Sequence, residues 1–144
     1  MGDRRATLPG IHTIRSTIPG VVLGSDEDRA IWCNPFDSRG KVVACRVIPD
    51  ALHSGADTNN MQLGLVNKGL LGVGTTVVAP QKAYASGIDL VAFKPDVIPV
   101  SATAVDVIID EGEVLAFSKD ENGTGLASPD LVVEVDIEFV GPTI

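Results

Sequence analysis

The chain of 144 residues is predicted to be all-β, an antiparallel β-sandwich of jelly-roll-like form with about eight strands. The composition is 44% apolar but only 4% aromatic, and much of the apolar part is Val and Ile, which favour strands. Fifteen Gly and nine Pro interrupt the chain every few residues. Short β-branched runs between frequent turn formers, about 8–12 residues apart, are typical of sandwiches and barrels.

The clearest strand is expected over residues 131–140. Apolar and acidic side chains alternate there, and successive side chains leave a strand on opposite faces. One face is therefore apolar, and the other carries an acidic stripe of Glu134, Asp136 and Glu138. This stripe is either a solvated sheet face or a surface that meets Arg residues of a neighbouring subunit. A turn is expected before the strand, over residues 119–125, where Asn122-Gly123 is a favoured pair for positive φ.

The other strands are short apolar or alternating runs bounded by turn formers. For residues 103–109 a short helix is the alternative, but Val105, Val107 and Ile109 alternate and favour a strand. Trp32 is expected in the core, and Cys33 and Cys45 are expected to be small buried hydrophobes. The expected segments are 21–23, 29–33, 41–48, 61–66, a strand following a glycine-rich loop within 70–79, 88–93, an edge segment 97–100, 103–109 and 114–117.

Two regions are expected along the chain: an extended N-terminal arm over residues 1–20 and a single β-sandwich domain over residues 21–144. The arm alternates weakly, and it carries Pro9 and Pro19, each followed by Gly. We expect it to pack on another surface, with an added edge strand or a disordered terminus as alternatives.

The formal net charge is −8, and it is distributed unevenly. Residues 1–50 have a net charge of +1 and hold all six Arg, whereas residues 51–144 have a net charge of −9. An acidic chain is not expected to bind nucleic acid, which requires clustered Lys and Arg. No apolar run reaches the roughly 18–20 residues of a membrane span, and no signal-peptide core is present. We therefore expect a soluble protein made in a cytoplasm, without a membrane partner and with reduced cysteines.

The sequence predicts no catalytic residue, no cofactor and no metal site. His12 and His53 are the two histidines, and neither they nor the cysteines have zinc-ligand spacing, although a site built from His12, Cys33, Cys45 and His53 stays open. No GxSxG motif is present. The loop 120–123 lacks the remaining ligands of a calcium-binding loop.

Residues 84–92, Tyr-Ala-Ser-Gly-Ile-Asp-Leu-Val-Ala, are similar to the first motif of trimeric dUTPases. The resemblance implies a nucleotide hydrolase in which Asp89 belongs to the active site. The family's Arg-Ser-Ser motif and the aromatic residue of its C-terminal glycine-rich motif have no counterpart here, because every Arg precedes residue 84.

A second resemblance extends over about residues 34–140, to the jelly-roll capsid decoration (cement) proteins and other small virion proteins of tailed bacteriophages. It implies homotrimers seated on the lattice of a major capsid protein, without catalysis or cofactor. Glu113 stands where the family's Gly-Asp-Val-Leu motif has Asp. The segments that carry the resemblance are Asn-Pro-Phe at 34–36, Gly-Lys-Val-Val at 40–43, 57–63, Asn-Lys-Gly at 67–69, Glu-Gly-Glu-Val-Leu at 111–115 and 123–129.

We therefore expect a non-enzymatic virion protein on the capsid surface, synthesised in the host cytoplasm. A tail, neck or receptor- or glycan-binding virion module is the alternative, although few aromatic residues are available to stack on glycans. Charge and extension indicate the residues that contact the capsid or another subunit: Arg4, Arg5, Ile11, Ile14, Arg15, Ile18, Glu134, Asp136 and Glu138.

Overall fold

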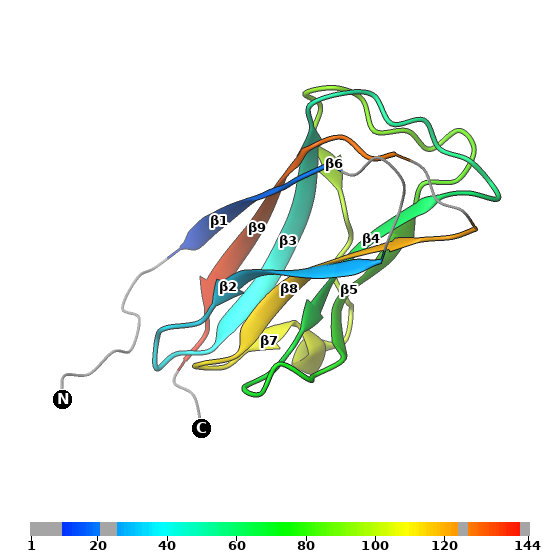
Figure 1. Cartoon of the computed structure of the whole chain (residues 1–144). Coiled ribbons are helices and arrows are strands. Elements are labelled where there is room, and N and C mark those ends of the chain that lie inside the picture. The colour runs from blue at the N-terminus through cyan, green and yellow to red at the C-terminus, as the bar shows by residue number, and fades with distance from the viewer. Residues whose placement is uncertain (1–9, 21–25, 124–126, 142–144) are drawn as a thin grey trace.

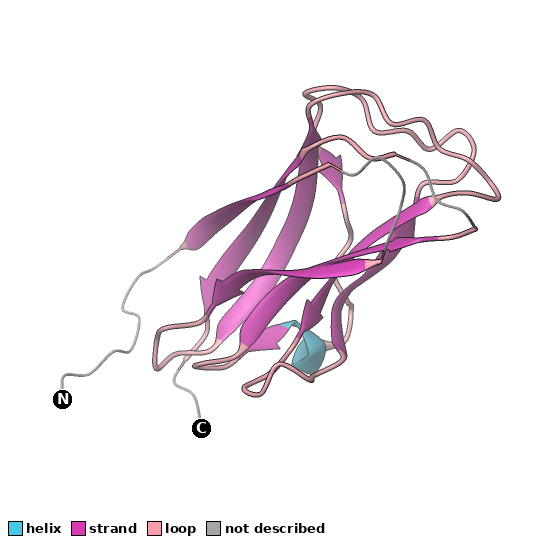
Figure 2. Cartoon of the chain, viewed as in Figure 1, coloured by secondary structure: helices cyan, strands magenta, loops and turns pink. Residues whose placement is uncertain are grey.

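The computed structural model describes residues 10–20, 26–123 and 127–141 of the chain. Two antiparallel sheets pack face to face around one core, so the predicted all-β sandwich is confirmed (Figure 1). Figure 2 shows strands and loops with one short 3₁₀ helix in the described part of the chain, η1 (Ala104–Val107). No helix among these residues is long and apolar enough to cross a bilayer.

The strand order is that of a jelly roll. The first sheet has the order β1-β9-β3-β6, with β7 paired to β3, and the second has the order β2-β8-β4-β5. Each sheet thus interleaves early and late strands, as two Greek keys require. The strands are β1 (Ile11–Ile18), β2 (Glu27–Cys33), β3 (Gly40–Pro49), β4 (Met61–Asn67), β5 (Thr76–Ala83), β6 (Asp96–Val97), β7 (Ile108–Ile109), β8 (Val114–Glu121) and β9 (Leu131–Phe139).

The alternation predicted for the last strand is present in β9. Val133, Val135 and Ile137 are each at most 1% exposed, and they pack in the same core as Leu63 of β4 and Phe117 of β8. β9 lies between β1 and β3, so its outward side chains have neighbours on both sides.

The segment expected to be an arm contributes a strand to the sandwich. β1 pairs with β9 along its whole length, from Ile11 opposite Glu138 to Ile18 opposite Leu131. Ile18 is 2% exposed in the core and Ile14 packs against it. The sheet therefore begins at Ile11 rather than after residue 20, because Ile14 and Ile18, four residues apart on one face of the strand, pack in the core. Residues 1–9 lie outside the described residues.

Several local predictions are wrong. Residues 88–93 form a loop in which Leu90 makes an isolated bridge to His53, and most of 103–109 is η1 followed by the two-residue β7. β8 continues to Glu121, past the predicted break. Cys33 is exposed, whereas Cys45 is buried as predicted. Trp32 is partly buried and packs against the core, and the predicted strand 21–23 lies outside the described residues.

Candidate functional site

A network of charged and polar side chains covers the outer face of the first sheet. Arg46 of β3 donates from Nε to Glu134 Oε1 at 2.7 Å and from Nη1 to Asp136 Oδ2 at 2.9 Å. From the other side, Arg15 of β1 donates to Glu134, and the Thr13 hydroxyl donates to Asp136 at 2.7 Å. The strand register places these groups side by side, since Glu134 lies opposite both Arg15 and Arg46.

The electrostatics of this network keep both carboxylates ionised. Hydrogen bonds from Arg46 and Arg15 lower the pKa of Glu134, and hydrogen bonds from Arg46 and Thr13 lower the pKa of Asp136. The side chains of Glu134 and Asp136 are only 11% and 18% exposed. The arginine partners of this part of the acidic stripe therefore belong to the same chain, and the network ties β1 to β3 across β9.

The remaining predicted contact residues divide into three groups. Ile14 and Ile18 face the core, so they stabilise the sandwich. Ile11, which is 52% exposed, and Glu138, also exposed, remain on the surface. Arg4 and Arg5 lie outside the described residues.

Two of the four histidine and cysteine side chains, His53 and Cys45, are buried. His53 is 4% exposed, its Nδ1 lies 3.1 Å from the carbonyl oxygen of Ala127, and burial lowers its pKa. Burial raises the pKa of Cys45 to about 12, which makes this thiol unreactive. His12 packs against Phe139. Within residues 10–20, 26–123 and 127–141, no three His, Cys, Asp or Glu side chains are placed to hold a metal ion.

The dUTPase-like segment holds two loops together. Tyr84 is fully buried, and its hydroxyl donates to Asp96 Oδ2 at 2.6 Å. Asp89 Oδ1 accepts a hydrogen bond of 2.8 Å from the backbone N–H of Gly55. The two loops approach so closely at Gly55 that a Cβ there would lie 1.9 Å from the carbonyl oxygen of Ala85. Both side chains of the motif therefore have structural partners.

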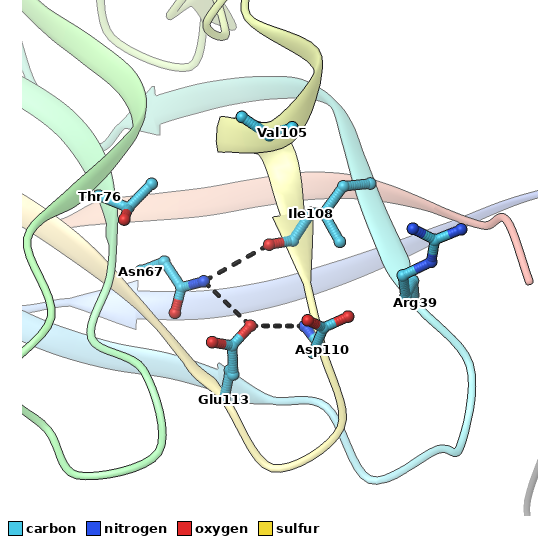
Figure 3. Close-up of a pocket in the computed structure, with 7 residues that line it drawn as sticks. All are labelled: Arg39, Asn67, Thr76, Val105, Ile108, Asp110 and Glu113. Atoms are coloured by element: carbon cyan, nitrogen blue, oxygen red, sulfur yellow. Dashed lines mark hydrogen bonds between the residues drawn. The ribbon is translucent and has the colours of Figure 1, made fainter. Parts of the chain in front are cut away.

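A pocket of about 320 Å³ lies at the end of the sandwich where β7 and η1 meet the β4–β5 loop (Figure 3). Glu113 Oε1 accepts hydrogen bonds from the backbone N–H of Asp110 at 2.7 Å and from Asn67 Nδ2 at 3.2 Å. The lining residues are Arg39, Asn67, Thr76, Val105, Ile108, Asp110 and Glu113.

Exposed apolar side chains lie on η1 and on the β4–β5 loop, whose two ends, Asn67 and Thr76, line this pocket. Leu70, Leu71 and Val73 of the β4–β5 loop are 71%, 86% and 78% exposed, and Val105 of η1 is 76% exposed. We call these four residues the pocket rim. The loop is held at its base, because the N–H of Lys68 donates to the carbonyl of Val114 at 2.8 Å. The sequence analysis did not predict this surface. The feature that could have indicated it is the run of three large apolar residues, Leu70, Leu71 and Val73, within a glycine-rich turn.

A second exposed apolar cluster lies at the opposite end of the sandwich, on the loops that follow β3 and β5 (Figure 1). Its members, which we call the far-end cluster, are Leu52, Ile88, Val91 and Phe93. Phe93 is 76% exposed with φ of 60°, a conformation that non-glycine residues seldom adopt. Backbone hydrogen bonds join the two loops. The N–H of Phe93 donates to the carbonyl of Pro49, and His53 and Leu90 each donate to the carbonyl of the other.

The fold and these surfaces define a small jelly-roll-like β-sandwich whose described surface offers apolar clusters at both ends. No protein-family model matches the chain, and no curated protein matches it. Among solved structures, a chain of turnip yellow mosaic virus matches with 12% identity and a TM-score of 0.38, covering 95% of this chain and 96% of that one. A chain of infectious bursal disease virus, Gx strain, matches with 10% identity and a TM-score of 0.39, covering 92% of this chain and 37% of that one. At such identities and TM-scores, a match establishes no shared function.

Proposed function

We propose that this chain is a virion structural protein of a tailed bacteriophage, specifically a decoration (cement) protein that stabilises the lattice of the major capsid protein. It would act as a homotrimer on the capsid surface, after synthesis in the host cytoplasm. The observation that carries the proposal is the presence of two separate apolar surfaces, the pocket rim and the far-end cluster, at opposite ends of one sandwich.

A cement protein stabilises a shell by contacting neighbouring subunits at the same time, so it needs at least two contact surfaces on a body that does not deform. Contiguous exposed apolar residues are typical of protein–protein contact sites. The sheet between the two ends suits the role of a rigid spacer, because the Arg46 network already satisfies the charges on its outer face. Jelly rolls also occur in lectins and enzymes, so the proposal rests on these surfaces rather than on the fold.

Co-sedimentation of the purified chain with expanded phage heads tests the proposal. Wild-type protein should bind the heads and raise the temperature at which they release DNA. Leu71→Asp at the pocket rim and Phe93→Asp in the far-end cluster should each weaken binding at least tenfold. Val97→Asp is the matched control, since Val97 is 62% exposed but lies on the short strand β6, in neither cluster.

Two results would overturn the proposal. One is an absence of wild-type binding to expanded and mature heads alike. The other is labelled protein that appears at the tail alone when virions are imaged, which would favour a tail or neck module. Release of pyrophosphate from dUTP with Mg²⁺ would instead support the hydrolase alternative. We expect no release, because the Asp89 carboxylate already accepts a hydrogen bond from the backbone N–H of Gly55.

A further inference from the structure

The pocket beneath the rim is acidic and incompletely paired. Residues 110–113 read Asp-Glu-Gly-Glu, and Arg39 is the one cationic side chain among the described residues that line the pocket. Asp110 Oδ1 is buried and receives no hydrogen bond among the described residues. Burial, with the nearby charge of Glu113, raises the pKa of Asp110. The charge of Arg39 opposes this shift in the pKa of Asp110. A cation bound in the pocket would add positive charge beside Asp110 and Glu113.

Arg39 has the converse deficit. Its backbone is fixed by hydrogen bonds with Val140 and Gly141, but its buried Nε has no acceptor in the part of the chain that the structure describes. Asp110 and Arg39 both line the pocket, so a ligand there meets a carboxylate and a guanidinium on neighbouring walls (Figure 3). A matching ligand would carry a cation and an anion close together, with apolar groups to cover the rim.

We propose that residues 1–9 of a neighbouring copy of this chain occupy the pocket. Their sequence is Met-Gly-Asp-Arg-Arg-Ala-Thr-Leu-Pro. Arg4 and Arg5 match the carboxylates of the pocket in charge, and the adjacent Asp3 matches the guanidinium of Arg39. Leu8 supplies an apolar side chain for the rim. This contact would form the self-association within the proposed function, on which it rests for its biological setting: the pocket rim would meet a neighbouring copy, and the far-end cluster would be left for the capsid lattice.

The strand register places the start of β1 at the pocket's end of the sandwich. Ile11 lies opposite Glu138, and the next residue, Phe139, lies opposite Gly40, which also pairs with Ile109 beside the pocket. β1 is nevertheless separated from β7 by β9 and β3, a distance of roughly 14 Å across the sheet. Nine extended residues span at most about 30 Å, which is sufficient to reach a neighbouring molecule.

This contact is head-to-tail, because each copy gives its N-terminal segment to one neighbour and receives a segment from another. Heterologous contacts of this kind close into rings when the rotation permits, and a trimer is one such ring. Each copy carries a net charge of −8, so copies of the chain repel one another. The basic pair Arg4 and Arg5 would offset part of this repulsion at the contact.

Chemical cross-linking of the full-length chain tests the occupant directly. Thr7→Cys and Thr76→Cys are combined with Cys33→Ser, and the protein is treated with a short bis-maleimide, with Cys45 protected by burial. We expect cross-linked dimers and trimers on a denaturing gel. In the control, Thr58→Cys at the far end replaces Thr76→Cys and should give monomers. A cross-link within single chains would show that the segment folds back into its own pocket, and it would overturn the proposal, as would the absence of any cross-link.

Complementation in trans provides a second test that needs no capsid. A chain lacking residues 1–9 keeps the pocket, and an Asp110→Lys chain keeps the segment. Each should be monomeric alone in sedimentation velocity, with at least a tenfold loss of self-association, and the two should associate when mixed. Melting curves check that both variants fold. Failure to associate on mixing would refute the inference, whereas capsid binding by monomers would leave the decoration function intact.

Discussion

Arg46 holds two carboxylates at once, and replacing it with Met should reveal how much the cross-strand network stabilises the fold. The substitution keeps an unbranched apolar stem but removes the guanidinium that bonds Glu134 and Asp136. After the change, Glu134 would retain Arg15 and Asp136 would retain the Thr13 hydroxyl. Each carboxylate would therefore lose its strongest partner without becoming wholly unpaired.

The burial of the network determines the size of the effect. Exposed ion pairs contribute about 0–1 kcal/mol, whereas removing one partner of a fully buried pair costs about 3–5 kcal/mol. The Arg46 side chain is 27% exposed and those of Glu134 and Asp136 are 11% and 18% exposed, which lies between these limits. We expect Arg46→Met to lower the free energy of unfolding by about 2 kcal/mol at pH 7.

The cost should depend on pH in a defined direction. The pKa values of Glu134 and Asp136 are lowered in the folded protein, so below about pH 5 the unfolded chain binds more protons and stability falls as the pH falls. The arginine's contribution is therefore complete at pH 7 and is lost as both carboxyls become protonated. At pH 3 the difference between Arg46→Met and wild type should be much smaller than at pH 7.

Urea unfolding followed by the fluorescence of Trp32 measures this difference, since Trp32 is the one tryptophan and packs edge-on to Phe139. Arg29→Met is the matched control: Arg29 pairs with Glu27 at 3.3 Å with a side chain 44% exposed, and its loss should cost under about 0.5 kcal/mol. A cost for Arg46→Met below about 0.5 kcal/mol at pH 7, or one that stays constant from pH 7 to pH 3, would refute the reasoning.

Three further predictions concern the strand β1 and the buried titratable groups. Ile18→Ala should lower the free energy of unfolding in urea by about 3 kcal/mol because Ile18 is 2% exposed. Ile11→Ala, at an exposed position of the same strand, should change this free energy by under about 0.5 kcal/mol. Equal losses of stability in the two variants would contradict the assignment of β1 to the core. Lys119 is 1% exposed, and burial lowers its pKa while the charges of Glu121 and Glu27 oppose that shift. Lys119→Met removes the attraction of the ammonium for these two carboxylates, so it should lower stability at pH 7 by about 1 kcal/mol or more in urea unfolding. A gain in stability would show that the burial of the charge outweighs this attraction. Burial also lowers the pKa of His53, so a proton NMR titration should find its imidazole still mostly neutral at pH 6.5, and a midpoint above that pH would contradict the burial.

The sequence was most informative where a long alternating run lies in the middle of a sheet. The runs that became β3 and β9 have neighbours on both sides, so burial of one face follows directly from their apolar period. Residues 103–109 show why the same signal fails in short segments. Val107 is buried and Val105 is 76% exposed. A 3₁₀ turn can place residues two apart on opposite sides, one buried and one exposed, as readily as a strand does.

Tertiary contacts account for two other departures. Residues 88–93 are apolar enough for a strand, but hydrogen bonds of Asp89 with Gly55 and of Leu90 with His53 fix them as a loop. Cys33 is exposed because the pairing of β2 with β8 shifts between Ala30 and Trp32, and such a bulge changes which side chains face the core. Neither a partner distant in sequence nor a bulge is visible in local periodicity.

The acidic stripe shows the same limit for function. Its spacing predicted a charged face, but only the strand order could show that β9 lies between two strands that each bring an arginine. Once these charges are paired within the chain, a partner would have to desolvate the network to bind there, at a cost that its contacts would have to exceed. The apolar ends carry no such cost, because covering Leu71 or Phe93 removes apolar surface from water. Under the proposed function, assembly through the two ends therefore costs less desolvation of charge than assembly through the sheet face would cost.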